Sequence, residues 1–140
     1  MKRTLLLLLI AFVALTTTAQ EKKITVSYYN SNEFGLAIFS NKGIYPELRI
    51  AADNEQIKDA TYSFFLRKEY ILDESMGVDL SCGLGFSYSD LDEEYMRLPV
   101  YITKKKVFSG NLKLMVGLEF KTEFADEFKV LPKIGVGINF

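Results

Sequence analysis

Residues 129–140 read KVLPKIGVGINF, and two kinds of position alternate along them. The even positions from Val130 to Phe140 are apolar, whereas the odd positions are mostly lysine, glycine or asparagine. A period of two is typical of a β-strand with one face toward an apolar environment. The strand runs to Phe140, although free chain ends normally fray and carry polar residues. We therefore expect this segment to close a larger β-structure.

Seven earlier segments repeat the same period of two between short turn-like connections. The eight predicted strands cover residues 22–29, 33–40, 44–52, 60–72, 76–89, 95–105, 111–124 and 129–140. Short connections join antiparallel neighbours, and a closed barrel leaves no strand edge unpaired. Several of these lengths suit the roughly 9–11 residues with which a tilted strand crosses a membrane. The pattern predicts an all-β, eight-stranded antiparallel up-and-down transmembrane β-barrel.

The first 19 residues have the three parts of a secretory signal peptide. Lys2 and Arg3 precede an apolar run at 5–15, and small residues end at Ala19. We predict cleavage after Ala19, which leaves residues 20–140 as one barrel domain. The apolar run is too short for a membrane helix of about 20 residues. Gln20 in place of a cysteine argues against a lipid anchor.

Composition excludes several classes of function. Without Lys2 and Arg3 the chain is acidic, so nucleic acid is not an expected partner. The chain has no histidine and no hydrolase-type serine motif, so we predict that it is not an enzyme, with no cofactor and no metal. The single cysteine, Cys82, cannot form an internal disulfide and is interpreted as a small apolar residue.

Glycines decide which face of the strands is inside. Gly83, Gly85, Gly117 and Gly135 lie on the polar face, and glycine within a strand is costly unless space is short. Space is short inside an eight-stranded barrel, so we predict that the polar face lines the lumen. Buried charges must be paired there. The predicted lumen charge network is Glu47, Arg49, Arg67, Glu69, Asp79, Arg97, Lys113, Glu119, Lys121, Glu123, Lys129 and Lys133.

On the apolar face, the type of residue changes from the ends of the strands to their middles. Aromatic residues such as Tyr28, Phe34, Tyr88 and Phe124 lie toward strand ends, while leucine, isoleucine and valine occupy the middles. This order resembles the two aromatic girdles of a membrane barrel. It favours an outer face in contact with lipid.

The whole chain resembles the small outer-membrane β-barrel proteins of Gram-negative bacteria, often labelled porin-like. The likeness is carried by the signal ending at Ala19 and Gln20 and by the strands SCGLGFSYS, RLPVYITKK, LMVGLEF and KIGVGINF. It implies an outer-membrane location and a structural or surface-interaction role in the cell envelope. It also implies that Ile134, Val136, Ile138 and Phe140 form the signal read by the barrel-assembly machinery. We expect a monomer.

With both termini periplasmic, as the resemblance implies, an acidic loop faces outward. Its acids are Asp90, Asp92, Glu93 and Glu94. Carboxylates suit a divalent cation, but the glycine and spacing of an EF-hand loop are missing, and a solvated loop is the commoner explanation. One hypothesis is that the acidic rim engages lipopolysaccharide through bridging cations. At the other rim, Lys104, Lys105 and Lys106 meet anionic headgroups or keep a turn soluble.

Two alternatives for the function remain open. The barrel is a narrow passage for ions or small solutes, although eight strands normally leave a lumen filled by side chains. Alternatively, it is a soluble periplasmic barrel of the lipocalin kind that binds an apolar ligand, with its two faces reversed. Outer-membrane lipid is the expected partner in every case except the last.

Overall fold

The computed structural model describes residues 23–39, 43–52, 60–89, 94–108, 110–123 and 128–140. The predicted signal peptide, its cleavage site and the loop residues Asp90, Asp92 and Glu93 lie outside this part of the chain. The described part has no helix long and apolar enough to span a membrane.

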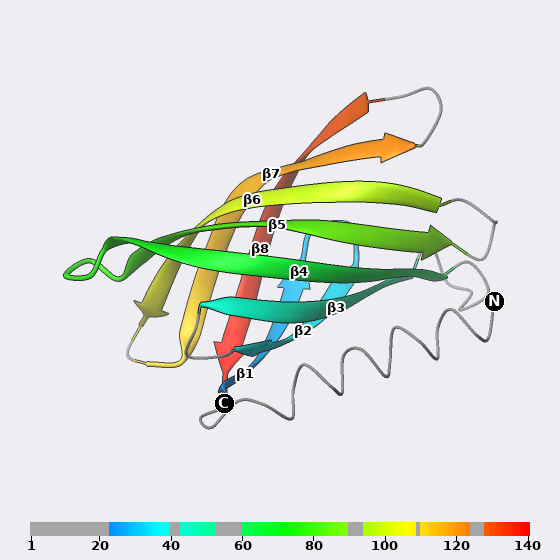
Figure 1. Ribbon diagram of the computed structural model, residues 1–140. Coiled ribbons are helices and arrows are strands. Elements are labelled where there is room, and N and C mark those ends of the chain that lie inside the picture. The colour runs from blue at the N-terminus through cyan, green and yellow to red at the C-terminus, as the bar shows by residue number, and fades with distance from the viewer. Residues whose placement is uncertain (1–22, 40–42, 53–59, 90–93, 109, 124–127) are drawn as a thin grey trace.

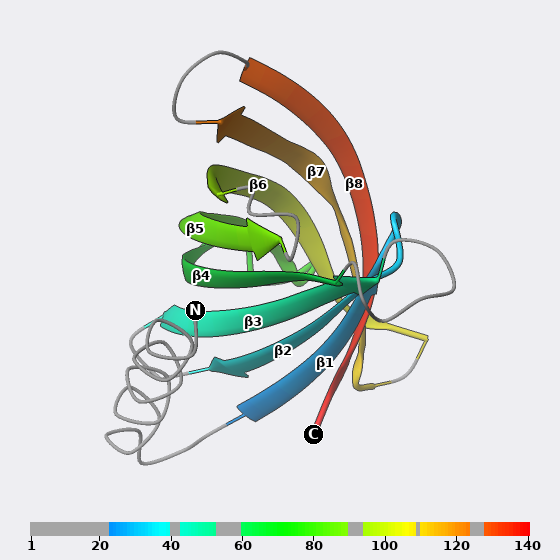
Figure 2. The ribbon, with the colours of Figure 1, turned by 90° about the vertical axis from the view of Figure 1, so that its right-hand side faces the viewer.

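Eight antiparallel strands form one closed barrel, which confirms the predicted fold class (Figure 1). Every strand pairs with its neighbours in sequence, and β8 closes the circle against β1 (Figure 2). The strands are β1 (Lys23–Tyr29), β2 (Glu33–Phe39), β3 (Ile44–Ala52), β4 (Ala60–Asp73), β5 (Val78–Ser89), β6 (Glu94–Val107), β7 (Leu112–Glu123) and β8 (Phe128–Asn139).

Two strand ends depart from the predicted limits by two residues: β5 begins at Val78 rather than Met76, and β6 ends at Val107 rather than Lys105. Pairing with β7 continues past the lysine-rich segment to Val107, with a register shift between Lys104 and Val107. Lys106 has a positive φ of 56°, which marks the irregularity. A residue inserted into one strand bends that strand and redirects its side chains. The start of the turn predicted at Lys106 is therefore a bulged part of the strand.

The pairing register sets the tilt of the strands. One row of paired residues joins Val26, Leu36, Leu48, Phe64, Phe86, Met96, Thr122 and Phe128. The partner of Val26 on β8, however, is Ile138. After one circuit of the barrel, the row of paired residues therefore meets β8 ten residues beyond Phe128. With a rise of 3.3 Å per residue and a strand spacing of about 4.8 Å, this shear gives a tilt of about 40°. Membrane barrels have tilts in this range.

The barrel is apolar outside and polar inside. Exposed apolar side chains occur on all eight strands, including Val26, Leu36, Ile50, Leu66, Leu84, Leu98, Val116 and Ile134. Their neighbours in sequence point inward, and buried charged residues come from β2 to β8. This is the arrangement that the glycine positions favour.

Two glycines make room for one buried aromatic ring. A Cβ added at Gly135 would lie 2.5 Å from Cδ1 of Tyr29, and one added at Gly35 would lie 3.2 Å from Cε2 of the same ring. Such distances are too short for ordinary contact between carbon atoms. The glycines of β2 and β8 therefore let Tyr29 fill the lumen from β1.

Candidate functional site

Arg49 occupies the centre of the lumen. It projects from β3 and is 1% exposed. Its Nε and Nη2 donate to the two carboxylate oxygens of Glu47 at 3.0 and 3.1 Å, and Nη1 donates to the Tyr101 hydroxyl at 3.2 Å. Nη1 also pairs with Glu119. A planar guanidinium can make these bonds in several directions at once, which suits a position surrounded by acceptors.

Aromatic rings enclose the same guanidinium. Its central carbon lies 3.9 Å from the centre of the Tyr29 ring and 4.3 Å from that of Phe65. Cations are attracted to aromatic faces, more strongly where water is excluded. The rings of β1 and β4 thus hold Arg49 in the plane of its carboxylate partners.

Arg67 extends the network toward the end of the barrel where β1 begins and β8 ends. Its Nη1 donates to Glu47 Oε2 at 2.6 Å and to the Tyr29 hydroxyl at 3.3 Å, and its Nη2 donates to Ser81. Tyr29 in turn donates to Glu47 Oε1 at 2.6 Å. Glu47 therefore accepts hydrogen bonds from two arginines and one tyrosine.

Arg97 extends the network toward the opposite end. It donates from Nη1 to Glu33 Oε1 at 2.6 Å and from Nη2 to Glu33 Oε2 at 3.1 Å. Nη2 also pairs with Glu119, while Glu33 lies 3.5 Å from Arg49 Nη1. These four side chains form a closed ring of alternating charge. Bidentate pairs of this kind are among the strongest hydrogen bonds in proteins.

A smaller cluster lies near the end of the barrel where β1 begins and β8 ends. Lys105 Nζ is 2.9 Å from Glu69 Oε2 and also pairs with Asp79. Lys113 is buried nearby in the sheet, with Nζ 4.2 Å from the centre of the Phe39 ring. The lumen thus carries paired charge from its middle to this mouth.

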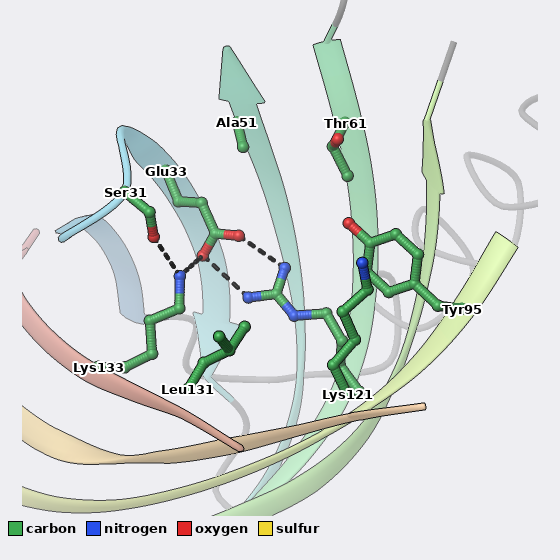
Figure 3. Close-up of a pocket in the computed structure, with 9 residues that line it drawn as sticks. Ser31, Glu33, Ala51, Thr61, Tyr95, Lys121, Leu131 and Lys133 are labelled. Atoms are coloured by element: carbon green, nitrogen blue, oxygen red, sulfur yellow. Dashed lines mark hydrogen bonds and ion pairs between the residues drawn. The ribbon is translucent and has the colours of Figure 1, made fainter. Parts of the chain in front are cut away.

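At the other mouth the lumen widens into a vestibule with a volume of about 240 Å³ (Figure 3). Its lining contains three cations and one carboxylate, together with hydroxyl and apolar groups. The residues are Ser31, Glu33, Ala51, Thr61, Tyr95, Arg97, Lys121, Leu131 and Lys133. Lys133 Nζ lies 3.0 Å from Glu33 Oε2 and 2.5 Å from the Ser31 hydroxyl oxygen, as Figure 3 shows. Lys121 Nζ lies 3.7 Å from the centre of the Tyr95 ring.

The structure places most of the predicted lumen charges inside the barrel. The buried ones are Glu47, Arg49, Arg67, Asp79, Arg97, Lys113, Glu119 and Lys133. Glu69 and Lys121 are half-buried, and Lys129 is exposed at the start of β8. The side chain of Glu123 lies outside the described residues. The arginines and their carboxylates come together, whereas Lys113 lies apart from the arginine cluster.

Sequence reasoning missed several members of the network. Glu33 begins a predicted strand but was not included among the lumen charges, and it is buried and paired with Arg97. Lys105 was assigned to a basic rim and instead pairs inside the lumen. Tyr29 bridges Glu47 and Arg67. Counting positions in twos from Gly35 places Glu33 inward, so a signal for it was present.

The predicted assembly residues lie on the outer face of β8. Ile134, Val136, Ile138 and Phe140 are all exposed, Phe140 by 73%. The backbone of Phe140 bonds to Ile24 in both directions, at 2.8 and 3.3 Å, and so joins the last residue to β1. In the predicted acidic loop, Glu94 is described. It is the exposed first residue of β6 rather than a loop residue.

The network fills the lumen with paired side chains. Its carboxylates are engaged by arginine, lysine or tyrosine. Among the described residues, no group of three or more metal-binding side chains is present. A buried ion pair costs little only when its hydrogen bonds are satisfied, and in this ring Nε of Arg97 is buried without a hydrogen-bond partner among the described residues.

No known family model matches the chain, and no curated protein matches it. A solved structure described as "De novo design of transmembrane beta-barrels" matches with a TM-score of 0.55 and 14% sequence identity. The match covers 85% of this chain and 92% of that chain. At this identity the likeness concerns the fold. The chain is an eight-stranded β-barrel that resembles a transmembrane barrel, which is compatible with membrane insertion.

Proposed function

We propose that the protein is a plugged barrel of the bacterial outer membrane with a structural or surface-interaction role in the envelope. The observation that carries this proposal is the distribution of side chains around the wall. Exposed leucine, isoleucine and valine cover the outside of all eight strands, while the arginines of β3, β4 and β6 and the glutamates that pair with them are inside. Soluble monomers seldom expose apolar patches of more than a few hundred Å². A lipid-facing wall requires such a surface.

The described lumen supports a plug over the two alternatives. A passage for solutes needs a continuous polar channel, whereas Arg49, Tyr29 and Phe65 pack against one another at mid-height. A lipocalin-like barrel needs an apolar interior, whereas the described interior is lined by paired charges. Charge of mixed sign that is satisfied internally fills space without attracting an apolar ligand.

Two measurements on cells and purified protein test membrane insertion. The protein should remain in the pellet after carbonate extraction, and its gel mobility should change on boiling because a closed barrel resists detergent until heated. Refolding into phosphatidylcholine vesicles should give the same heat-dependent shift. Carbonate-extractable protein without that shift would refute the membrane barrel.

The surface role is proposed for the acidic residues Asp90, Asp92, Glu93 and Glu94. Oxygen ligands suit calcium or magnesium, and such cations bridge carboxylates to phosphorylated lipid. Replacing the four by asparagine or glutamine should abolish any calcium-dependent association of the refolded barrel with lipopolysaccharide. The matched control replaces Glu74 and Asp73 of the opposite hairpin in the same way. Unchanged association in the first variant would sink this part of the proposal.

A further inference from the structure

The strands on one side of the barrel are short, so the wall extends less far along the barrel axis there. β1 and β2 have seven residues each, whereas β8 has twelve. β1 pairs with β8 only from Gly135 to Asn139, and a backbone bond from Asn30 to Ile134 at 2.8 Å ends the ladder. β8 continues from there back to Phe128, which corresponds to about 15 Å along the barrel axis at the tilt given above. The β1–β2 hairpin therefore leaves a notch beside β8.

Along this notch, side-chain hydrogen bonds replace strand pairing at the edge of β8. The Asn30 amide donates to the Pro132 carbonyl at 3.2 Å and accepts from the Ile134 backbone N–H at 3.1 Å. Pro132 has no N–H of its own, and proline is confined to strand edges that do not pair. Asn30 and Pro132 therefore leave the backbone of β8 at this point without a hydrogen-bonding group that requires another strand. Among the described residues, no strand pairs with this part of the β8 edge.

The notch lies at the depth of the apolar band. On β8, Phe128 and Val130 are apolar and exposed on the outer face. Both lie beyond the level that the β1–β2 hairpin reaches. Backbone at membrane depth is tolerated outside a helix or closed sheet only where it lines protein or a water-filled cavity. The vestibule supplies that cavity, because its lining includes Ser31 of the hairpin and Leu131 of β8.

The vestibule has an excess of positive charge among its described lining residues. Arg97, Lys121 and Lys133 face one carboxylate, Glu33, which already binds both Arg97 and Lys133. The hydroxyl groups of Thr61 and Tyr95 line the same space. A volume of about 240 Å³ accommodates a phosphate group with a few waters, since one water occupies about 30 Å³ of liquid.

We propose that the notch admits the anionic phosphate headgroup of a membrane lipid into the vestibule, while the acyl chains stay outside against β8. This inference rests on the proposed membrane insertion. Lys121 and Lys133 bind the phosphate oxygens, and Leu131 contacts the part of the lipid nearest the glycerol, while Arg97 stays bound to Glu33 and Glu119. Charge-assisted bonds to phosphate are strong where water is limited. The low wall thus serves as an entrance for lipid.

The test uses the folded barrel in neutral detergent with EDTA, which removes cations that bridge acidic loops. Titration calorimetry compares dihexanoyl phosphatidic acid, dihexanoyl phosphatidylcholine and inorganic phosphate. Phosphatidic acid should bind at least about tenfold more tightly than either of the others, because only it offers both the charge and the chains. Equal binding of inorganic phosphate would assign the site to a free anion and overturn the lipid entrance. Absence of binding by phosphatidic acid would overturn the site itself.

Two variants locate the binding. Lys121→Gln removes one vestibule charge, and Ala51→Phe fills the cavity without changing charge; each should weaken phosphatidic acid binding about tenfold or more. The matched control, Lys23→Gln, removes one exposed lysine at the start of β1 and should bind as the wild type does. Binding unchanged by both vestibule variants would overturn the inference. The heat-dependent gel shift, measured on each sample, reports folding separately, so failure to insert into vesicles remains a distinct result.

Discussion

The guanidinium carbon of Arg49 lies 3.9 Å from the centre of the Tyr29 ring, with Glu47 bonded to both side chains. One cation from β3 is therefore fixed by a ring from β1 and a carboxylate from its own strand. The contact joins strands from different parts of the wall through the lumen. Barrel stability should depend on it.

Arg49→Met should destabilise the barrel by about 3–5 kcal/mol, because it leaves Glu47 and Glu119 buried without their shared partner. Arg49→Lys should recover only part of this loss, since an ammonium cannot form the same fork of bonds. Urea unfolding in vesicles, followed by gel shift, gives the free energy. Lys23→Met on the exposed start of β1 is the control. A loss below 1 kcal/mol for Arg49→Met would contradict the central role of Arg49.

Removal of the plug should open the lumen. Wild-type protein in planar bilayers should show no discrete conductance, because side chains fill the middle of the barrel. The double variant Glu47→Ala with Arg49→Ala removes one charge of each sign, so it opens space without changing the net charge. It should show small single-channel steps. Steps of equal size in the wild type would favour the passage function instead.

A charge on the outer wall should cost stability according to depth. Leu118→Arg, near the middle of β7, should cost about 2–4 kcal/mol in vesicles, and Leu112→Arg at the strand end about 0–1 kcal/mol. Both leucines face outward in the register with β8. The two unfolding free energies should therefore differ by at least about 1 kcal/mol. Equal costs would mean that this face does not lie in lipid.

Overfilling the lumen beside Tyr29 should also be costly. Gly135→Ala places a Cβ 2.5 Å from the Tyr29 ring and should destabilise the barrel by about 1–3 kcal/mol. Gly110→Ala is the matched control, because nothing lies within 4 Å of the Cβ that it adds. Thermal unfolding in detergent compares the two. A stable Gly135→Ala variant would show that Tyr29 can move away.

Deletion of Phe140 should affect assembly more than stability. The deletion removes two backbone bonds to Ile24 but none of the lumen network. The amount of heat-shifting protein in the membrane fraction should fall several-fold, while the unfolding midpoint of refolded protein changes little. Phe128→Ala, at the exposed far end of β8, serves as the control. Normal assembly of the truncated chain would remove the predicted signal role.

The strands and their faces could be predicted because a period of two is a local property of the sequence. Segment 44–52 was placed at the limits later observed for β3. The pairing of the charged residues could not be predicted. It depends on the register shift between neighbouring strands, summed around the whole barrel. Arg97 and Glu33 are 64 residues apart and meet only with the observed register.

Local cues were also misleading at two positions. Three consecutive lysines at 104–106 indicated a solvated turn, yet the bulge directs Lys105 toward Asp79. Lumen aromatics such as Phe65 were not predicted, because the polar face was interpreted from its glycines and charges alone. In both cases the same residue type suits two environments, and only the three-dimensional register selects one.

The closure of β1 against β8 has a consequence for how the chain folds. The hydroxyl of Thr25 donates to Asn139 across 114 residues of sequence, and Lys133 meets Glu33 across 100. Contacts of such long range form late, because the entropy of closing the loop is lost before they can compensate for it. In the proposed membrane barrel, an open sheet would expose unneutralised ions to hydrocarbon until these contacts form. There, charge neutralisation and entry into the bilayer should occur in one cooperative step.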